Sequence, residues 1–191
     1  MNRIEKMKKV LARRLSSITL VAEATYMRHN LSAMFRTAEA FGLQNVHFIT
    51  DHSLSTSSAS RGSERWLDIF VHDNSERCLK GLREKGFSLY VAGFDEGAYT
   101  PENLPVDGSV ALIMGTELSG VSDTARNLSD GTVMIPMSGF TQSFNVSVAT
   151  ACLLYRITER RRDIVGKGDL SSQEQKEILQ KWIERENKII N

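Results

Sequence analysis

The sequence is poor in cysteine, with only Cys78 and Cys152 among its 191 residues. Both lie in apolar or helical patterns, which predicts reduced thiols and a cytoplasmic protein. The four histidines are scattered along the chain, and no Cys/His group has the spacing of metal ligands. We therefore predict that the protein has no metal site.

Long hydrophobic runs are missing as well. The longest, residues 148–155, is interrupted by Thr150 and is far shorter than a bilayer-spanning helix, so we expect no membrane contact. The N-terminal stretch MNRIEKMKKVLARRL is basic but has no apolar core region, which argues against a secretory signal. What remains, with 41% hydrophobic and 25% charged residues, is the composition of one globular domain.

A large excess of charge of one sign is also absent, because the formal net charge is +1. The charges are nevertheless distributed unevenly, and basic residues gather in residues 3–14 and again in residues 156–167. Either cluster alone is explained by a solvated helix face. Together, on either side of a near-neutral middle, they favour an anionic partner such as RNA.

Short apolar runs that alternate with helical patterns organise the rest of the chain. Strands are predicted at residues 19–24, 46–50, 67–71, 88–94, 110–114 and 133–137. Helices are predicted at residues 31–41, 75–85, 122–128, 146–164 and 171–189. This alternation predicts an α/β fold with a mostly parallel sheet and helices on both faces.

Ligands of parallel sheets bind at the carboxyl ends of strands, and polar, glycine-containing stretches follow several predicted strands here. In the first, RHNLSAMFRTAEAFG, helix capping explains Asn30, whereas Arg36 points away from the buried stripe and is either a surface residue or a site residue. In the second, LIMGTELSGVSD, Gly115 and Gly120 have P-loop spacing, but the lysine that nucleotide hydrolysis needs is missing. A tight turn explains these glycines but not Glu117.

The third stretch, IPMSGFTQSFNVSVAT, passes from a strand to a helix through a polar cluster. Ser143 or Asn145 can cap the helix, but capping does not account for both of them together with Gln142. Several hydrogen-bond donors that capping does not use, placed after a buried strand, are typical of a ligand site. Because no G-x-G-x-x-G follows the first strand, an ordinary dinucleotide site is not indicated. The residues alone therefore predict an α/β protein with a polar site built from its late loops.

Taken together, the three stretches resemble the SPOUT class of methyltransferases, and specifically the SpoU/TrmH family of RNA ribose 2′-O-methyltransferases. The matching residues are, in order, Asn30 and Arg36, then Gly115, Glu117 and Gly120, then Pro136, Ser143, Asn145 and Ser147. Their order, spacing and types all agree with the family's motifs, and the resemblance extends over nearly the whole chain.

This resemblance implies a fold, a cofactor and an assembly. In that family the C-terminal part of the chain threads a loop to form a deep trefoil knot, an exception to the rule against knots. The knot holds S-adenosylmethionine, which implies contacts around Ala92, Gly115, Ile135 and Phe144 here. The family also implies a homodimer whose active site lies at the subunit interface.

The implied reaction is the attack of a ribose 2′-hydroxyl on the sulfonium methyl group. In the family view, the residue matching Arg36 activates this hydroxyl with help from an RNA phosphate. Because arginine stays protonated, we expect Arg36 to stabilise the developing alkoxide instead, while the proton leaves to phosphate or water. The resemblance implies positioning roles for Asn30, Glu117, Ser143 and Asn145.

Within the family, the wording of the motifs is most similar to that of the enzymes that methylate guanosine 18 of tRNA. As in those enzymes, short helical extensions at residues 1–17 and 166–191 flank a catalytic domain at residues 18–165. The alternatives are another target, such as the tRNA wobble position or ribosomal RNA, and a catalytically silent RNA-binding homologue.

Basic residues outside the motifs are the candidates for further RNA contacts. We expect these contacts at Arg13 and Arg14 near the N-terminus, and at Arg61 and Arg65 in a loop that is more basic than the resemblance leads us to expect. The terminal helices have a second explanation, because the apolar face that includes Trp182 suits packing in a dimer.

Overall fold

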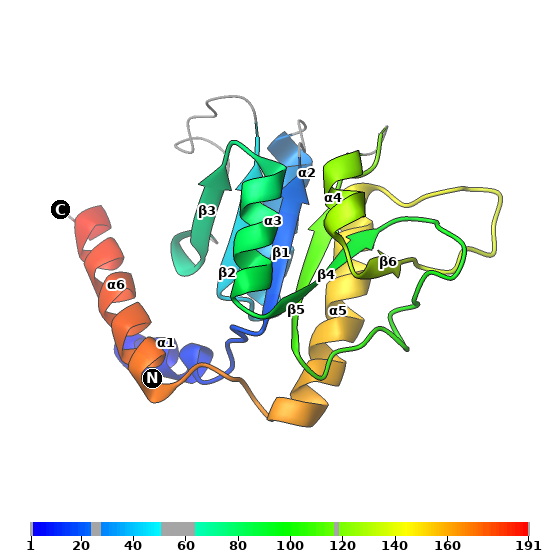
Figure 1. Cartoon of the computed structure of the whole chain (residues 1–191). Helices are drawn as coiled ribbons and strands as arrows, with labels where there is room; N and C mark the ends of the chain where they lie inside the picture. Colours follow the sequence, from blue (N-terminus) through cyan, green and yellow to red (C-terminus); the bar gives the residue numbers. More distant parts are fainter. Residues whose placement is uncertain (1, 24–27, 51–63, 117–118, 191) are drawn as a thin grey trace.

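The computed structural model of the chain describes residues 2–23, 28–50, 64–116 and 119–190. Its centre is a sheet of six parallel strands in the order β3-β2-β1-β5-β4-β6 (Figure 1). The strands are β1 (Ile18–Glu23), β2 (Asn45–Ile49), β3 (Asp68–His72), β4 (Phe87–Ala92), β5 (Ser109–Met114) and β6 (Gly131–Val133). The predicted α/β fold is confirmed, and the described part of the sheet is parallel throughout.

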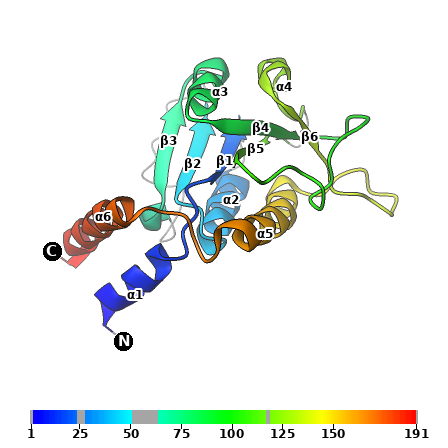
Figure 2. The same ribbon diagram turned by 60° about the horizontal axis from the view of Figure 1, so that its bottom comes forward.

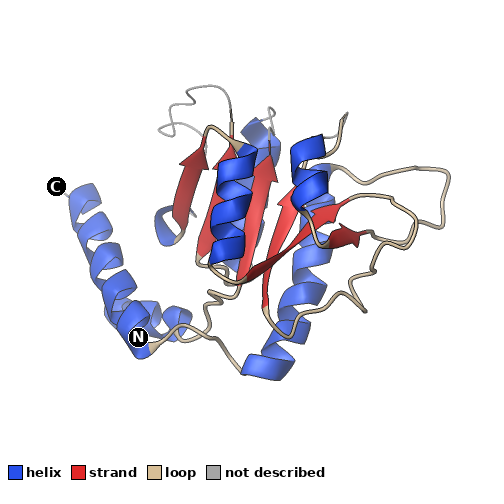
Figure 3. Cartoon of the chain, in the orientation of Figure 1, coloured by secondary structure: helices blue, strands red, loops and turns tan. Residues whose placement is uncertain are grey.

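Helices cover both faces of the sheet (Figure 3). One face carries α3 (Ser75–Glu84) and α4 (Asp123–Leu128), and the other carries α2 (Arg28–Ala40) and α5 (Val146–Val165). Alternation along the strands explains the two layers, because each second side chain points to the opposite face and packs in a different apolar cluster. None of the described helices is both long and apolar enough to cross a membrane.

The last strand is shorter than the sequence predicts, whereas the other predicted elements agree with the observed ones within three residues at each end. The apolar pattern predicts a strand at residues 133–137, but β6 ends at Val133. β6 lies at the edge of the sheet. It pairs with β4 over three residues, and on its other side Tyr99 alone bridges to Val133. Pro136 has no N–H to donate to a ladder. Residues 134–145 therefore form an irregular segment that connects the edge of the sheet to α5.

The terminal helices α1 (Arg3–Leu11) and α6 (Ser172–Ile190) pack against each other beside the sheet (Figure 2). An ion pair between Arg3 and Glu186 joins them at 2.8 Å. Their shared apolar cluster consists of Met7, Leu11, Leu170, Ile178 and Trp182. The apolar face of α6, for which the sequence also suggests packing in a dimer, is thus covered by contacts within the chain.

Several residues of the second basic cluster, residues 156–167, form hydrogen bonds within the protein. Three of its arginines donate hydrogen bonds to main-chain carbonyls of distant loops. The carbonyls are those of Pro101 and Leu104 for Arg160, of Val106 and Asp107 for Arg161, and of Arg13, Phe41 and Lys167 for Arg162. These three cations stabilise connections of the sheet, whereas Arg156 is partly exposed and Lys167 is exposed.

Arg14 requires a correction. Its side chain is completely buried, donates to the Leu43 carbonyl at 2.5 Å and pairs with Glu39 at 2.8 Å. Its guanidinium also lies over the ring of Trp182, 5.3 Å from the centroid. Burial lowers the pKa of Arg14, although Glu39 opposes this shift. The residue ties α2 and α6 to the end of α1, and it has no exposed surface with which to contact RNA.

Candidate active site

A cavity of about 800 Å³ opens at the carboxyl ends of β4 and β5. Its walls are the segment after β4, the loop after β5, the irregular residues 134–145 and the first turns of α5. All four residues that we expect to hold a cofactor line it, namely Ala92, Gly115, Ile135 and Phe144. Ser143, one of the expected catalytic residues, lies in the same wall. This end of a parallel sheet is the usual place for a ligand.

One side of the cavity is apolar and another is charged. Met114, Val133 and Leu153 belong to the main core and form the apolar side. On the charged side, Arg126 of α4 donates both hydrogen bonds of an ion pair to Asp95, at 2.6 and 2.8 Å. Sequence reasoning missed this pair, and the only available signal was an acidic residue shortly after a predicted strand. The pair fixes the segment after β4 against α4, so the cavity wall is braced on that side.

The loop after β5 shows why glycine occupies both ends of the motif. Thr116 and Gly120 exchange backbone hydrogen bonds of 2.9 and 3.1 Å, and Gly120 has a φ of +67° that favours glycine. A β-carbon at Gly115 would lie 2.1 Å from the Gly120 carbonyl carbon. A tight turn therefore explains the glycines, as the sequence suggests, and the same turn forms part of the cavity wall. Glu117 lies outside the described residues.

A buried carboxylate anchors the far end of this loop. Glu23, at the end of β1 and 3% exposed, accepts hydrogen bonds from the Ser122 backbone N–H and from the Ser122 hydroxyl, both at 2.7 Å. It also accepts one from the Ser75 hydroxyl at the start of α3. Sequence reasoning missed Glu23, although a carboxylate at the end of a strand otherwise buried on both faces is a recognisable signal. Glu23 holds α4, and with it the turn after Gly115, against the sheet.

The first and third motifs meet through two asparagines. Asn145 is the N-cap of α5, as expected for one of the polar residues there, and its side-chain oxygen accepts from the Ser147 N–H at 2.9 Å. Its amide nitrogen donates to the side-chain oxygen of Asn30 at 3.2 Å. Asn30 lies inside α2 and is 2% exposed, so the expectation that it caps this helix is wrong. The contact places α2 directly against the end of the segment that lines the cavity.

Arg36 lies outside this cavity. It is exposed on α2, as the helical pattern predicts, and lines a second cavity of about 610 Å³ between α1, α2, α6 and the short helix η2 (Glu64–Trp66). Among the described residues, none lines both cavities. Arg36 is also about 9 Å farther along the helix axis than Asn30. A single chain therefore does not bring the expected catalytic arginine to the expected cofactor residues.

The second cavity is rich in cations. Its basic lining residues are Arg3, Lys6, Arg36 and Arg65. Glu186 pairs with Arg3 at 2.8 Å and with Arg65 at 3.4 Å, and the hydrogen bond from Arg3 lowers the pKa of Glu186. Within the described part of the chain, Lys6 and Arg36 form no ion pair, so both are free to meet a phosphate group.

The remaining candidates for RNA contacts differ in their placement. Arg65 lines the second cavity together with Arg36, and its guanidinium carbon lies over the Trp66 ring, 4.8 Å from the centroid. Arg13 is exposed on the stretch that follows α1. Arg61 lies outside the described residues. Arg65 is therefore the one of these that the described structure brings close to the expected catalytic arginine.

Two of the four histidines lie side by side in the structure, although they are far apart in the sequence. His47 Nδ1 lies 2.9 Å from His72 Nε2, and Cys78 lies beside them. Burial, and then the neighbouring His72, lower the pKa of His47 to about 4. Burial, and then Arg77, lower the pKa of His72, while burial and Glu23 raise the pKa of the Cys78 thiol to about 12. The spacing of these residues in the sequence, which shows no metal-ligand pattern, did not reveal this group.

Comparison with known proteins places the chain in a family. Residues 17–155 match the model of the SpoU rRNA Methylase family, which includes the cavity and all three motifs. The chain belongs to this family. SpoU methyltransferases act on RNA as ribose 2′-O-methyltransferases and bind S-adenosylmethionine. The matched range contains the three stretches assigned to the family by resemblance, including Asn30 and Asn145, which are in contact.

Individual SpoU relatives act on different RNAs. A tRNA (guanosine(18)-2′-O)-methyltransferase of Thermus thermophilus is 32% identical over 188 residues, which cover 96% of each chain. The 23S rRNA (guanosine-2′-O-)-methyltransferase RlmB of Xanthomonas axonopodis pv. citri is 33% identical over 76% of this chain and 59% of its own. Among solved structures, the TrmH/SpoU tRNA modifying enzyme of A. aeolicus is 29% identical, covers 96% of each chain and gives a TM-score of 0.85.

Proposed function

We propose that this SpoU methyltransferase uses S-adenosylmethionine to methylate the 2′-hydroxyl of guanosine 18 in tRNA. The observation that carries the proposal is the cavity at the ends of β4 and β5, which is lined by all four residues assigned to the cofactor by resemblance. The choice of target is supported by the Thermus thermophilus match, which extends over 96% of this chain, whereas the RlmB match covers 76%.

The residues of the cavity fit this cofactor. Its volume of about 800 Å³ lies within the range of about 300–1,000 Å³ that is usual for ligand pockets. Ile135 and Leu153 offer apolar surface suited to adenine, while the turn after Gly115 and the polar segment before α5 offer main-chain and hydroxyl groups. When bound there, the cofactor supplies an electrophilic methyl group on a positively charged sulfur.

The protein's task is then to orient the ribose and to stabilise charge. The oxygen–methyl bond forms as the sulfur–methyl bond breaks, and the hydroxyl proton leaves to a phosphate oxygen or to water. Arg36 stabilises the developing alkoxide as a fixed cation, and Lys6 beside it helps to hold a phosphate. Asn30 and Asn145 hold α2 against the cofactor segment, and Ser143 and Glu117 position the ribose and the donor.

A homodimer would complete the site, because Arg36 and the cofactor cavity lie apart within one chain. Exposed apolar side chains beside and on α5 are suited to meet a second copy: Phe144, just before the helix, is 42% exposed, and Val148 and Tyr155, on the helix, are 46% and 53% exposed. In this arrangement, the Arg36 of the partner subunit reaches the cofactor held by the first. The SpoU unit at residues 18–165 would supply both halves, and the terminal helices would add the cations beside Arg36.

Mixed dimers test this arrangement. We expect an equimolar mixture of Arg36→Ala chains and Gly115→Ala chains, reassembled at random, to recover about a quarter of the wild-type sites, because half of the dimers are mixed and each mixed dimer has one intact site. The readout is methyl transfer at a cofactor concentration too low for Gly115→Ala to bind. Each variant alone should be inactive, and a mixture no more active than its components would place the whole site in one chain.

The deep trefoil knot is part of the same proposal. Its support is that the chain leaves edge strand β6 and returns beneath the sheet, where α5 packs on α2 (Figure 1). The backbone path in a crystal structure would test it. A backbone whose C-terminal segment does not pass through a loop of the preceding chain would rule the knot out.

The target is tested by transfer of labelled methyl groups to an unmodified tRNA transcript, followed by nuclease mapping. We expect one label per tRNA, at the ribose of guanosine 18, and no label on a transcript in which the D-loop is deleted. Label at another ribose, including the wobble position, would keep the reaction and overturn the target. A chain that binds the cofactor but labels neither tRNA nor ribosomal RNA would be an RNA-binding homologue without activity.

A further inference from the structure

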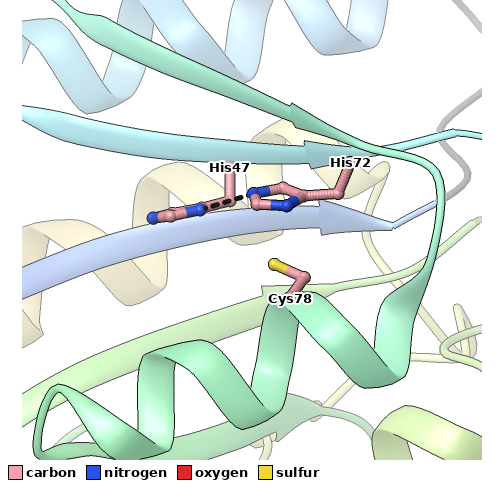
Figure 4. A group of neighbouring side chains, drawn as sticks. All are labelled: His47, His72 and Cys78. Carbon is pink, nitrogen blue, oxygen red and sulfur yellow. Dashed lines mark hydrogen bonds between the residues drawn. The ribbon is translucent and has the colours of Figure 1, made fainter.

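Three potential metal ligands interrupt an otherwise apolar layer between α3 and the sheet. The layer contains Val21, Ile49, Leu79, Leu82, Val91 and Ile113. At its edge, His47 of β2, His72 of β3 and Cys78 of α3 point toward one another (Figure 4). One ligand atom from each lies within 4.8 Å of the other two. Neither the SpoU motifs nor the proposed methyl transfer uses any of the three.

The strand register explains why these side chains meet. Parallel pairing sets His47 opposite Phe70 and Ile49 opposite His72, so both imidazoles lie on the face that α3 covers. The His47 ring stacks on the His72 ring at 5.2 Å and on the Phe70 ring at 5.0 Å between centroids. Cys78 lies in the first turn of α3, directly after the turn that follows β3. Neighbouring strands and one helix thus hold the three ligands in place before any ion arrives.

The cluster is buried on the sides of His47 and Cys78 and open to solvent on the side of His72. His47 is 6% exposed and Cys78 3% exposed, whereas His72 is half-buried and gives access from solvent. The charges nearby include the carboxylates of Glu23, on the side of Cys78, and of Asp73, on the side of His72, with Lys85 and Arg77 as the opposing cations. Arg77 is itself paired with Asp73. A cation at the cluster therefore meets surroundings of nearly balanced charge.

We propose that His47, His72 and Cys78 bind one zinc ion, with water as the fourth ligand on the side of His72. Imidazole and thiolate are the ligands that zinc prefers, with bonds of about 2.0–2.1 Å to nitrogen and about 2.3 Å to sulfur. The ligand atoms need only modest movements. The two nitrogens separate by a few tenths of an ångström, and a nitrogen–sulfur pair closes by up to about 1.3 Å to reach tetrahedral distances. The Cys78 thiol loses its proton to solvent as the sulfur–zinc bond forms.

The zinc would fasten the edge of the sheet. β3 is an edge strand, and in the described structure β2 is the strand that it pairs with. A metal bridge would link β3 to α3 and to β2. The site is separate from the cofactor cavity, since none of its three ligands lines that cavity.

The experiment uses the full chain without a histidine tag, freed of metal by chelation and then titrated with cobalt(II) and zinc(II). We expect one cobalt per chain, with the near-ultraviolet band of a thiolate-to-cobalt transition and the visible bands of a four-coordinate ion. Zinc should displace the cobalt. At zinc concentrations about 100-fold above the dissociation constant, the melting temperature should rise by about 5 °C or more.

Variants separate this site from casual binding. Cys78→Ser should remove the thiolate band, and His72→Gln, at a half-buried position where folding should survive, should weaken binding at least tenfold. Cys152→Ser removes the exposed cysteine and should change nothing. Binding that persists unchanged in Cys78→Ser and His72→Gln, or that is lost in Cys152→Ser, would overturn the assignment. So would a metal-free chain that takes up no cobalt or zinc, which would leave His47 and His72 as a hydrogen-bonded pair.

Discussion

Replacing Arg36 with alanine should slow methyl transfer by about 10²–10³-fold, the usual cost of removing one donor that stabilises a developing oxyanion. The affinity for S-adenosylmethionine should remain nearly unchanged, because Arg36 lines a different cavity from the expected cofactor residues. Single-turnover kinetics with saturating tRNA would measure the first quantity and calorimetry the second. Arg36→Lys should recover little, since a single ammonium cannot reproduce the planar guanidinium.

A matched control for this substitution lies on the other face of the sheet. Arg77 on α3 is exposed, pairs with Asp73 and lies away from both cavities, so Arg77→Ala should retain full activity. If Arg36→Ala lowered cofactor affinity in parallel with turnover, Arg36 would be a cofactor ligand or a structural residue. A normal rate at saturating tRNA with a raised KM would instead limit Arg36 to RNA binding.

Replacing Gly115 with alanine should weaken binding of S-adenosylmethionine by about tenfold to a hundredfold. The new β-carbon would lie 2.1 Å from the Gly120 carbonyl carbon, so the turn has to open and its backbone has to move in the cavity wall. Overpacking of this kind typically costs about 1–3 kcal/mol, which corresponds to that range of affinity. Calorimetric titration with the cofactor would measure the change, and circular dichroism would report whether the fold is kept.

Gly108 provides the control for added volume alone. It lies in the loop before β5, where a β-carbon would meet nothing within 4 Å, so Gly108→Ala should bind the cofactor normally. Cofactor affinity of Gly115→Ala equal to that of Gly108→Ala would contradict the role of the turn. It would show either that the loop relaxes without cost or that the cofactor does not touch this wall.

The sequence predicts the layers and the cavity well because both depend on local patterns. Buried strands read as short apolar runs, and the polar stretches after them converge because parallel strands end at the same edge of the sheet. The stretch that holds Ser143 could therefore be placed near Gly115 from the pattern, whereas Phe144 was assigned there by resemblance to the family. β6 is the exception, because the apolar residues at 133–137 do not show that this strand pairs with β4 only at residues 131–133.

Charged residues were harder to assign, because their partners are distant in sequence. Arg161 donates to carbonyls 54 and 55 positions earlier, and Arg14 donates to a carbonyl 29 positions later. No periodic pattern in the sequence predicts which loop carbonyls accept hydrogen bonds from a given arginine. The same reason hid Glu23 and the His47–His72 pair, whose meaning depends on strand order and register. The charge pattern of residues 156–167 therefore did not reveal that Arg160, Arg161 and Arg162 donate hydrogen bonds to main-chain carbonyls.

α1 can pack against α6 only after nearly the whole chain has been synthesised. Arg3 and Glu186 are 183 positions apart, a distance that a ribosome covers in about 10–40 s at usual bacterial rates. During that time Met7 and Leu11 have no apolar partner from α6. The strands of the sheet, which lie between α1 and α6 in the sequence, can already pair. α1 is thus synthesised long before α6, the helix against which it packs. It is the segment by which a nascent chain would engage a chaperone before its own C-terminal helix emerges.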